Sequence, residues 1–295
     1  MSATTRVCLI GFGEVGQAFA RDLLAREFHD LVAWDVQLPD PRSAPSRAIA
    51  TLGVRRATDL ADALRDAELI VCAVTAVNCA AVATSVAAIG LAGTYFLDLN
   101  SVAPDTKCDA AQRIEQGGGR YVEAAVMSPI APRGITSPIL LGGPHAQAFL
   151  ARASAFGLAG ASLYSPVLGR ASAAKMCRSV MVKGIESLLT ESLIAARHYG
   201  VEKTVLASLS DLFPVGDWPK LAQYMISRSL EHGTRRAEEM REVARTVSDA
   251  GLAPLLSAAT AERQDWSAAR KAALDADTLP DLLDRLLDLR NDPKC

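Results

Sequence analysis

The sequence predicts an α/β domain with a doubly wound, mostly parallel sheet over residues 1–166, followed by an all-α domain over residues 167–295. Two observations carry this prediction. Residues 6–143 alternate short apolar β-prone runs with segments of helical spacing, which is typical of a parallel sheet covered by helices. Beyond about residue 165 the spacing is helical throughout, so the domain boundary is expected there.

Each expected element follows from a local pattern. Strands are expected at residues 6–10, 31–34, 69–74, 94–99, 120–127 and 138–143, after which β signals vanish. In the first domain, helices are expected directly after the first strand and at residues 59–64 and 80–89. Residues 37–46 hold three prolines and are expected to form a surface loop. In the second domain, helices are expected at residues 171–198, 202–212, 218–248 in one or two pieces, 254–272 and 279–289.

The first strand runs without a spare residue into a glycine motif and then a helix. The motif is Gly11-Phe12-Gly13-Glu14-Val15-Gly16. Gly11 permits the tight turn, Gly13 lets a pyrophosphate approach the backbone, and Gly16 lets the helix pack close to the strand. The free N–H groups at the helix start face the anion. The motif therefore predicts a Rossmann-type dinucleotide site, although a glycine-rich turn in another kind of α/β protein is the alternative.

An acidic residue sits where such a site recognises the ribose. Asp35 ends the second apolar run, about 20 residues beyond the last glycine, where a carboxylate accepts hydrogen bonds from both ribose hydroxyls. This favours NAD, while Arg42 and Arg47 downstream leave NADP possible. The alternative for Asp35 is a solvated loop residue. Val74 and Thr75 follow the strand at 69–74 and are expected to border the ribose or nicotinamide, because ligands bind outside the carboxyl ends of parallel strands.

Composition excludes several classes of protein. A net charge of −2 and a pI near 6.1 argue against a nucleic-acid surface. No apolar run approaches the length of a membrane span, and a strand is expected from residue 6, so we expect a cytoplasmic protein without a signal peptide. The six cysteines form no C-x-x-C pair and read as reduced thiols. The four histidines lack metal-ligand spacing, so no metal site is expected.

The long helix at 171–198 carries a lysine that is a candidate general base. Lys175 and Ser179 are four residues apart and share a helix face. The neighbours of Lys175 in the sequence are small and mostly apolar, as expected of a helix that packs against the nucleotide domain. A lysine on such a helix suggests that its ammonium group faces a cleft. Partial burial there, with the positive charges of Arg178 and an oxidised nicotinamide nearby, would lower its pKa and make the neutral amine available. The alternative is a surface lysine whose stem covers apolar area. Lys183, roughly 80° around the helix, fits a solvated or interface position better.

Four motifs in order resemble those of the β-hydroxyacid dehydrogenase superfamily, which contains 6-phosphogluconate and 3-hydroxyisobutyrate dehydrogenases, and within it a poorly characterised bacterial phosphogluconate dehydrogenase-like branch with its own C-terminal domain. The resemblance covers nearly the whole chain. The motifs are the glycine motif at 11–16, the segment from Asp98 to Pro104 for D-x-S-T-x-x-P, Ala125 to Ile130 for A-P-V-S-G-G, and Gly169 through Lys175 to Ser179 for G-x-x-G-x-x-x-K-x-x-x-N.

The resemblance implies roles for these positions. It implies that Lys175 is the general base and that Asn100, Ser101 and Ser128 hold the substrate acid group or the nicotinamide. Pro129 and Ile130 fall at the glycines of the third motif, where a backbone N–H helps to bind the substrate carboxylate.

Three departures from the family pattern argue against a simple 3-hydroxyisobutyrate site. Pro129 has no N–H to donate. Ser179 replaces an asparagine by a shorter hydroxyl, and Ser172 replaces a glycine of the lysine motif.

A second segment, residues 232–236, could bind the acid group of the substrate instead. His232 is followed by Arg235 and Arg236, and a guanidinium matches a carboxylate or phosphate with two parallel hydrogen bonds. The resembling branch carries a similar arginine pair, and related enzymes complete the site with a C-terminal Arg and His, often from the partner subunit. The alternative is a charged helix face in which both arginines pair with Glu239. We take Arg236 and His232 as the candidate substrate contacts.

These observations together predict an enzyme. The predicted activity is hydride transfer between nicotinamide and a hydroxy or keto acid, with a sugar acid among the candidates and Lys175 as general acid and base. The cofactor is NAD, with NADP possible, and a homodimer or higher homo-oligomer is expected. Two alternatives stay open: a non-catalytic NAD(H)-binding redox sensor, and an imine or keto reductase on the same fold.

Overall fold

The computed structural model describes residues 5–213 and 216–288. The chain divides into two compact units, Met1–Met176 and Cys177–Cys295, each with its own apolar core. The division falls inside a long helix, so no linker marks it. The assignment of residues 1–166 and 167–295 as separate domains stays a prediction.

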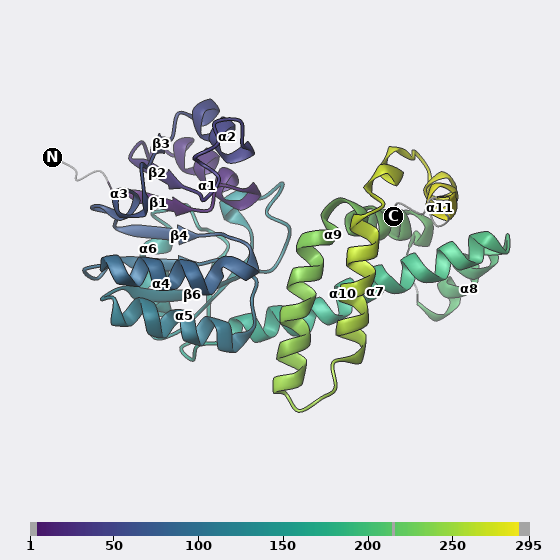
Figure 1. Cartoon of the computed structure of the whole chain (residues 1–295). Coiled ribbons are helices and arrows are strands. Elements are labelled where there is room, and N and C mark those ends of the chain that lie inside the picture. The colour runs from purple at the N-terminus through teal and green to yellow at the C-terminus, as the bar shows by residue number, and fades with distance from the viewer. Residues whose placement is uncertain (1–4, 214–215, 289–295) are drawn as a thin grey trace. The chain divides into compact units, whose positions relative to one another are not determined.

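The first unit is built on one eight-stranded sheet, which confirms the predicted fold class (Figure 1). Its strand order is β3-β2-β1-β4-β5-β6-β7-β8. All neighbours pair in parallel except β6 and β7. The strands are β1 (Val7–Ile10), β2 (Leu31–Trp34), β3 (Arg55–Arg56), β4 (Leu69–Cys72), β5 (Tyr95–Asp98), β6 (Arg120–Val126), β7 (Ile139–Gly142) and β8 (Ala161–Ser165).

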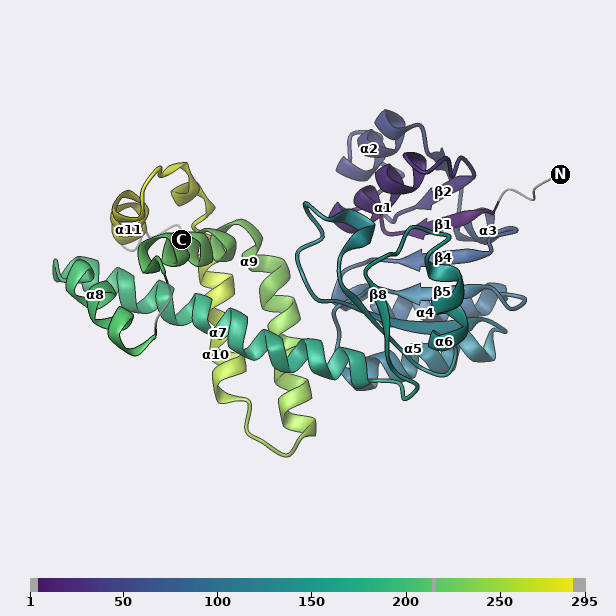
Figure 2. The ribbon, with the colours of Figure 1, turned by 180° about the vertical axis from the view of Figure 1, so that it is seen from behind.

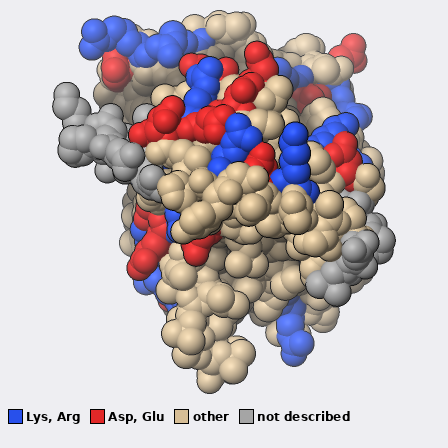
Figure 3. Space-filling model, turned by 90° about the vertical axis from the view of Figure 1, so that its right-hand side faces the viewer, with Lys and Arg blue, Asp and Glu red and all other residues tan. Residues whose placement is uncertain are grey.

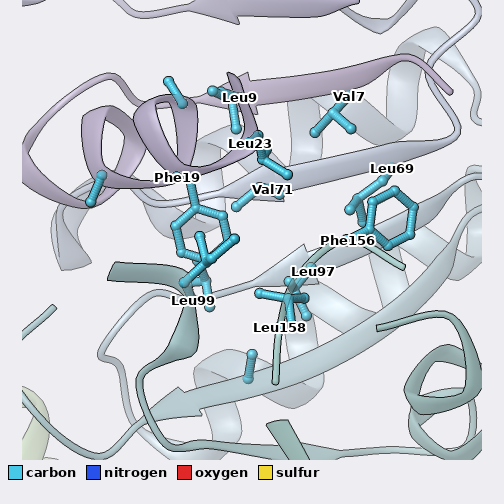
Figure 4. Packing of buried hydrophobic residues seen from close by; sticks show 14 of the residues in the cluster. Val7, Leu9, Phe19, Leu23, Leu69, Val71, Leu97, Leu99, Phe156 and Leu158 are labelled. Carbon is cyan, nitrogen blue, oxygen red and sulfur yellow. The ribbon is translucent and has the colours of Figure 1, made fainter. Parts of the chain in front are cut away.

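Helices cover both faces of this sheet. Val7 and Leu9 of β1 point into one core cluster together with Phe19 of α1 (Figure 4), whereas Cys8 and Ile10 point into the other. The first face is covered by α1 (Glu14–Leu24), α2 (Ala44–Leu52) and α6 (Ala146–Ala153). The second is covered by α3 (Leu60–Leu64), α4 (Cys79–Ile89) and α5 (Pro104–Gln116). Short 3₁₀ turns η1 (Ala76–Asn78) and η2 (Gly134–Thr136) follow β4 and β6. Figures 1 and 2 show the two faces from opposite sides.

Several elements differ from the sequence expectation, which includes neither α5 nor α6. The proline-rich stretch runs into helix α2, because Ser43 caps it and Pro45 occupies its first turn, where no N–H is needed. β3 is only two residues long. The prediction that strands end with residue 143 is wrong, since β8 adds to β7 in parallel. β8 is a half-exposed edge strand, so it carries no continuous apolar run.

The second unit is helical, as predicted. It holds the part of α7 (Arg170–His198) from Cys177 onward, α8 (Glu202–Leu212), α9 (Trp218–Asp249), α10 (Leu255–Ala268), the 3₁₀ turn η3 (Lys271–Asp275) and α11 (Leu279–Asp288). Its core includes Leu193, Ile226 and Leu283. Arg197 of α7 pairs with Asp284 of α11. The last residue of the expected helix at 279–289 lies outside the described residues.

α9 is kinked and packs closely on α10, beside which it runs in Figures 1 and 2. The backbone at His232 is non-helical (φ −120°, ψ 15°), which divides the helix into the two pieces that the sequence left open. Gly233 follows directly. A Cβ built there would lie 2.5 Å from the carbonyl oxygen of Gln264, so only glycine lets the two helices approach this closely.

Candidate active site

The glycine motif forms the turn between β1 and α1, and close contacts require glycine at two of its three glycine positions. Gly11 has φ +86°, and a Cβ there would lie 2.3 Å from the carbonyl oxygen of Ala73. A Cβ at Gly16 would lie 2.2 Å from the carbonyl oxygen of Gly11. At Gly13, in contrast, nothing lies within 4 Å of the built Cβ, so this backbone faces open space. The turn therefore offers a bare backbone at the helix start, which fits a pyrophosphate.

The remaining residues of the motif differ in their placement. The Phe12 side chain is fully buried, and its backbone carbonyl accepts a hydrogen bond of 3.0 Å from the Gln17 side chain. Glu14 is exposed in the first turn of α1, and Val15 packs against the core. Phe12 and Val15 thus hold the turn against the sheet.

Asp35 is held in place by two backbone groups. Its Oδ2 accepts a hydrogen bond of 2.8 Å from the Phe12 N–H, and its Oδ1 accepts one of 2.9 Å from the Gln37 N–H. The carboxylate thus joins the end of β2 to the glycine motif. This argues against the alternative of a merely solvated loop residue, because both oxygens are oriented.

A cavity of about 440 Å³ lies beside Asp35. It is lined by Trp34, Asp35, Val36, Leu38, Pro39, Arg56, Ala57 and Thr58. Apolar walls with one carboxylate and one guanidinium suit the adenosine half of a dinucleotide. Among the described residues, Arg56 lines this cavity, whereas Arg42 and Arg47 do not. Sequence reasoning missed Arg56, because its strand is only two residues long.

Asn100 joins the carboxyl ends of β4 and β5. Its Oδ1 accepts a hydrogen bond of 2.7 Å from the Val74 N–H, and its Nδ2 lies 3.4 Å from Cys72 Sγ and 3.5 Å from Cys79 Sγ. Asn100 is buried, while Thr75 begins the turn that follows. The structure thus places Asn100 and Val74 together and turns the amide inward.

Beneath Asn100 lies a buried polar network that sequence reasoning missed. Asp98 is fully buried; its Oδ1 lies 3.0 Å from Lys107 Nζ, and its Oδ2 accepts a hydrogen bond of 2.6 Å from the Tyr121 hydroxyl. Asp98 also accepts a hydrogen bond from the Asn100 N–H. Burial and the adjacent Asp98 charge raise the pKa of Cys79 to about 12, so this thiol stays protonated at neutral pH. The sequence signal for this network is Asp98 itself, a carboxylate at the end of the otherwise apolar strand β5.

Lys175 and Ser101 meet within the first unit. Lys175 Nζ donates to Ser101 Oγ at 2.6 Å, although the two residues are far apart in sequence. Ser172, one turn earlier on α7, donates from Oγ to the carbonyl of Val102 at 3.2 Å. The start of α7 is therefore tied twice to the loop that follows β5. A serine hydroxyl beside a lysine amine can accept a hydrogen bond from it or donate one to it.

The loop after β6 is arranged differently from a simple anion-binding turn. Ser128 donates from its hydroxyl to the carbonyl of Pro129 at 3.1 Å, and Pro129 is exposed. The Ile130 side chain is buried in the core cluster on the α1 face. Any contact of Ile130 with a ligand would therefore come from its backbone.

In the second unit, Ser179, Lys183 and Glu239 lie together. Lys183 Nζ donates to Glu239 Oε2 at 2.6 Å and to Ser179 Oγ at 3.4 Å. The expectation of a solvated or interface position for Lys183 is wrong, because the carboxylate of Glu239 lets the ammonium be buried. Arg235 also donates to Glu239, at 2.6 Å, as the alternative of a charged helix face requires.

Arg236 does not join that charged face. It pairs instead with Glu186 of α7, and both residues are buried. Gln264 Nε2 donates to the same carboxylate at 3.3 Å and to Ser229 Oγ at 3.2 Å. Burial raises the pKa of Glu186, which the Arg236 charge opposes. The expected Arg236–Glu239 pair is therefore replaced by a pair that fixes α9 to α7.

His232 lies at the α9 kink, beside a cavity of about 260 Å³. The cavity is lined by Leu230, Glu231, His232, Gly233, Thr234, Arg235, Ala268 and Lys271. Nε2 of His232 lies 2.5 Å from Arg228 Nη1 and 3.0 Å from Glu231 Oε2. Of the three candidate substrate contacts in this unit, His232 lines a cavity, Arg236 pairs with Glu186, and Ser179 accepts a hydrogen bond from Lys183.

The described residues contain no group of three or more His, Cys, Asp or Glu side chains that could hold a metal ion. Within the same ranges, no helix combines the length and apolarity needed to cross a membrane. On the face shown in Figure 3, acidic and basic side chains are interspersed among the described residues rather than separated.

Comparisons with known proteins support the nucleotide-binding fold of the first unit. The family model described as the NAD binding domain of 6-phosphogluconate dehydrogenase matches residues 6–164, and a domain of unknown function matches residues 196–267. A conserved hypothetical protein from Sinorhizobium meliloti is 37% identical over 96% of this chain and 97% of its own, with a TM-score of 0.70.

Two further solved structures are similar over most of the chain. The conserved protein MTH1747, of unknown function and described as structurally similar to 3-hydroxyacid dehydrogenases, is 29% identical over 89% of this chain and 97% of its own, with a TM-score of 0.66. A 3-hydroxyisobutyrate dehydrogenase from Mycobacterium tuberculosis, solved with L-serine, is 16% identical over 96% of this chain and 99% of its own, with a TM-score of 0.71. The latter shows a shared fold.

Proposed function

The chain belongs to the family defined by the NAD-binding domain of 6-phosphogluconate dehydrogenase, and on that premise we propose that it oxidises a hydroxy acid, or reduces the matching keto acid, with Lys175 as general acid and base. The observation that carries the proposal is the 2.6 Å hydrogen bond between Lys175 Nζ and Ser101 Oγ. It supports a polar centre at the carboxyl edge of the sheet, on the side where the glycine motif binds the dinucleotide.

In the oxidative direction, NAD held by the glycine motif and beside Asp35 would supply the acceptor for a hydride from the carbinol carbon of the substrate. Lys175 in its neutral form takes the hydroxyl proton, so that a carbonyl is formed and charge is balanced. Ser101 orients the amine through its hydrogen bond and offers a second polar contact to the substrate oxygen. In the reductive direction Lys175 returns the same proton.

The substrate acid group needs its own partner. Ser128 lies in the loop after β6 and supplies a hydroxyl, while Pro129 has no N–H to give. Ser179, His232 and Arg236 of the helical unit are the further candidates from the sequence. We take a polyhydroxylated or sugar acid as the substrate class, since its additional hydroxyls would make further hydrogen bonds to the protein where the backbone donor to the acid group is missing.

The experiment is a thermal-shift panel with NAD, NADP and a set of hydroxy and sugar acids, followed by turnover assays of every acid that stabilises the protein. A ligand that binds the folded state raises its apparent stability by mass action. We expect stabilisation by the cofactor and a further shift with one class of acid. Lys175→Met should retain the cofactor shift and lose on the order of 10²- to 10⁴-fold in kcat.

Near-normal turnover by folded, cofactor-bound Lys175→Met would refute the role of Lys175. Stabilisation by cofactor alone, with no turnover across the panel, would favour a redox sensor. Turnover of imines rather than hydroxy acids would favour an imine reductase on the same fold.

A further inference from the structure

Glu123 of β6 is a buried carboxylate that no step of the proposed function uses. It is 0% exposed, and both of its oxygens are occupied. Oε2 accepts a hydrogen bond of 2.8 Å from the Gly169 N–H, and Oε1 accepts one of 2.6 Å from the Ser172 N–H. These two backbone groups lie at the start of α7, the helix that carries Lys175.

The start of α7 lacks a cap of its own. The first N–H groups of a helix have no partner within the helix, and a side chain at the preceding residue usually accepts from them. Here that residue is Gly169, with φ +82°, which has no side chain to offer. The Ala173 N–H closes the first helical turn onto the carbonyl of Gly169. Glu123 therefore caps the helix from the sheet, with negative charge at the positive end of the helix dipole.

The sheet is shaped to hold this carboxylate. Glu123 faces Gly142 across the antiparallel β6–β7 pair. A Cβ built at Gly142 would lie 2.5 Å from Glu123 Oε2, so the absence of a side chain there makes the space for it. Burial raises the pKa of Glu123, and the charge of Lys107 opposes this rise. A carboxylate with two backbone donors and a nearby cation is a satisfied buried group rather than an accident of packing.

The bonds at the helix start continue to the reacting residues. Ser172, which donates its N–H to Glu123, donates its hydroxyl to the Val102 carbonyl, next to Ser101. One turn later, Lys175 donates to Ser101 itself. The bonds to Glu123 thus restrict rotation of the first turn of α7 about the helix axis, and this rotation determines where the Lys175 amine lies relative to Ser101. Errors of about 1 Å in such a pair are enough to reduce rates on the order of 10²-fold.

We propose that Glu123 is a positioning residue, which fixes the first turn of α7 so that the Lys175 amine stands at Ser101. The proposal rests on the proposed function, in which Lys175 moves the substrate proton. It assigns to Glu123 no contact with substrate or cofactor.

The test replaces Glu123 by glutamine, which keeps the shape but sets an amide NH₂ against one of the two backbone N–H groups. Asp22→Asn is the matched control, because the Asp22 carboxylate also accepts a backbone hydrogen bond from a distant segment, 2.8 Å from the Ile135 N–H, but has no bond to α7. The lysines are ¹³C-methylated, and the Lys175 signal is identified by its loss in Lys175→Arg. Its titration midpoint is measured by NMR, together with NADH affinity and, where an acid is turned over, kcat and KM.

For Glu123→Gln we expect a shifted Lys175 titration midpoint, a fall in kcat on the order of 10- to 100-fold and unchanged NADH affinity. Asp22→Asn should change none of these quantities. Folded Glu123→Gln with a wild-type Lys175 titration would overturn the proposal, as would equal effects in Asp22→Asn.

A second variant covers the case in which Glu123→Gln does not fold. Gly142→Ala retains the Glu123 residue but puts a methyl group 2.5 Å from its Oε2, so the carboxylate must move. The same shift in the Lys175 titration is therefore expected, and its absence counts against the proposal. The two hypotheses fail separately. If the wild type turns over no acid, the proposed function fails, while the NMR titration still decides whether Glu123 positions Lys175.

Discussion

Replacing Asp35 by asparagine should reduce the preference for NADH over NADPH. In the structure the Asp35 carboxylate is fixed by the Phe12 and Gln37 N–H groups at the rim of the cavity that suits adenosine. A 2′-phosphate bound there would bring about two negative charges close to this carboxylate. Asparagine keeps the shape and one hydrogen-bond acceptor but removes the charge.

The magnitude follows from Coulomb's law. At a separation of about 5 Å and an effective dielectric constant between about 40 and 80, one charge facing about two charges costs roughly 2 to 3 kcal/mol. The Arg56 guanidinium lines the same cavity and offsets part of this repulsion, so the lower end applies. About 2 kcal/mol corresponds to roughly a 30-fold change in the ratio of the two dissociation constants.

Titration of wild type and Asp35→Asn with NADH and NADPH, followed by fluorescence or calorimetry at fixed ionic strength, measures this ratio. NADPH should gain affinity relative to NADH, and the gain should shrink in high salt because the charges are screened. A loss of equal size for both cofactors would refute the argument, since it would mean that Asp35 only holds the Phe12 backbone. Arg56→Gln is the opposite control and should lower NADPH affinity more than NADH affinity.

Three further predictions concern stability and reactivity. Gly233→Ala should destabilise the helical unit by roughly 1 to 3 kcal/mol in urea titrations, because its Cβ meets α10, whereas Gly184→Ala has open space and should not. The hydrogen bond from Arg197 lowers the pKa of Asp284. This pair therefore stabilises the fold above the carboxyl pKa of the unfolded chain, and the stabilisation is lost as the pH falls through the lowered folded-state pKa. Asp284→Asn should lower the Tm at neutral pH but not below about pH 3. Burial raises the pKa of Cys8 to about 12, so mass spectrometry should find it unmodified by a thiol reagent in folded protein and modified in urea.

The dinucleotide half of the molecule could be predicted from sequence because its signals are local. A strand, a glycine turn and a helix follow one another within residues 6–24. Close contacts require Gly11 and Gly16, whereas the backbone at Gly13 faces open space. Helices α8 and α9 could be placed because their spacing is regular. β8 could not be predicted, because its residues are largely exposed and form no continuous apolar run. It is a strand because it pairs with β7, and that pairing is not visible in its own sequence.

The polar networks could not be predicted because they depend on which elements pack together. Nothing near Glu123 in the sequence announces that its carboxylate caps a helix that starts at residue 170. The sequence predicts a solvated or interface position for Lys183, because helical geometry places a side chain on a face but does not say what covers that face. Its partner Glu239 comes from a helix 56 residues further along the chain.

The order of strands in the sheet has a consequence for how the chain reaches its native state. β1 is the first strand made, yet it lies inside the sheet between β2 and β4, and Val7 pairs with Leu69. Until β4 is available, β1 keeps one row of unpaired backbone groups, and joining it requires the closure of a long loop, which is an unfavourable and slow step. Fragments that end before Leu69 should therefore lack a stable glycine turn, because the turn follows β1, which would pair with β2 but not with β4. Nucleotide binding should appear only in longer fragments that include β4. Cofactor binding would then follow the formation of the sheet rather than nucleate its folding.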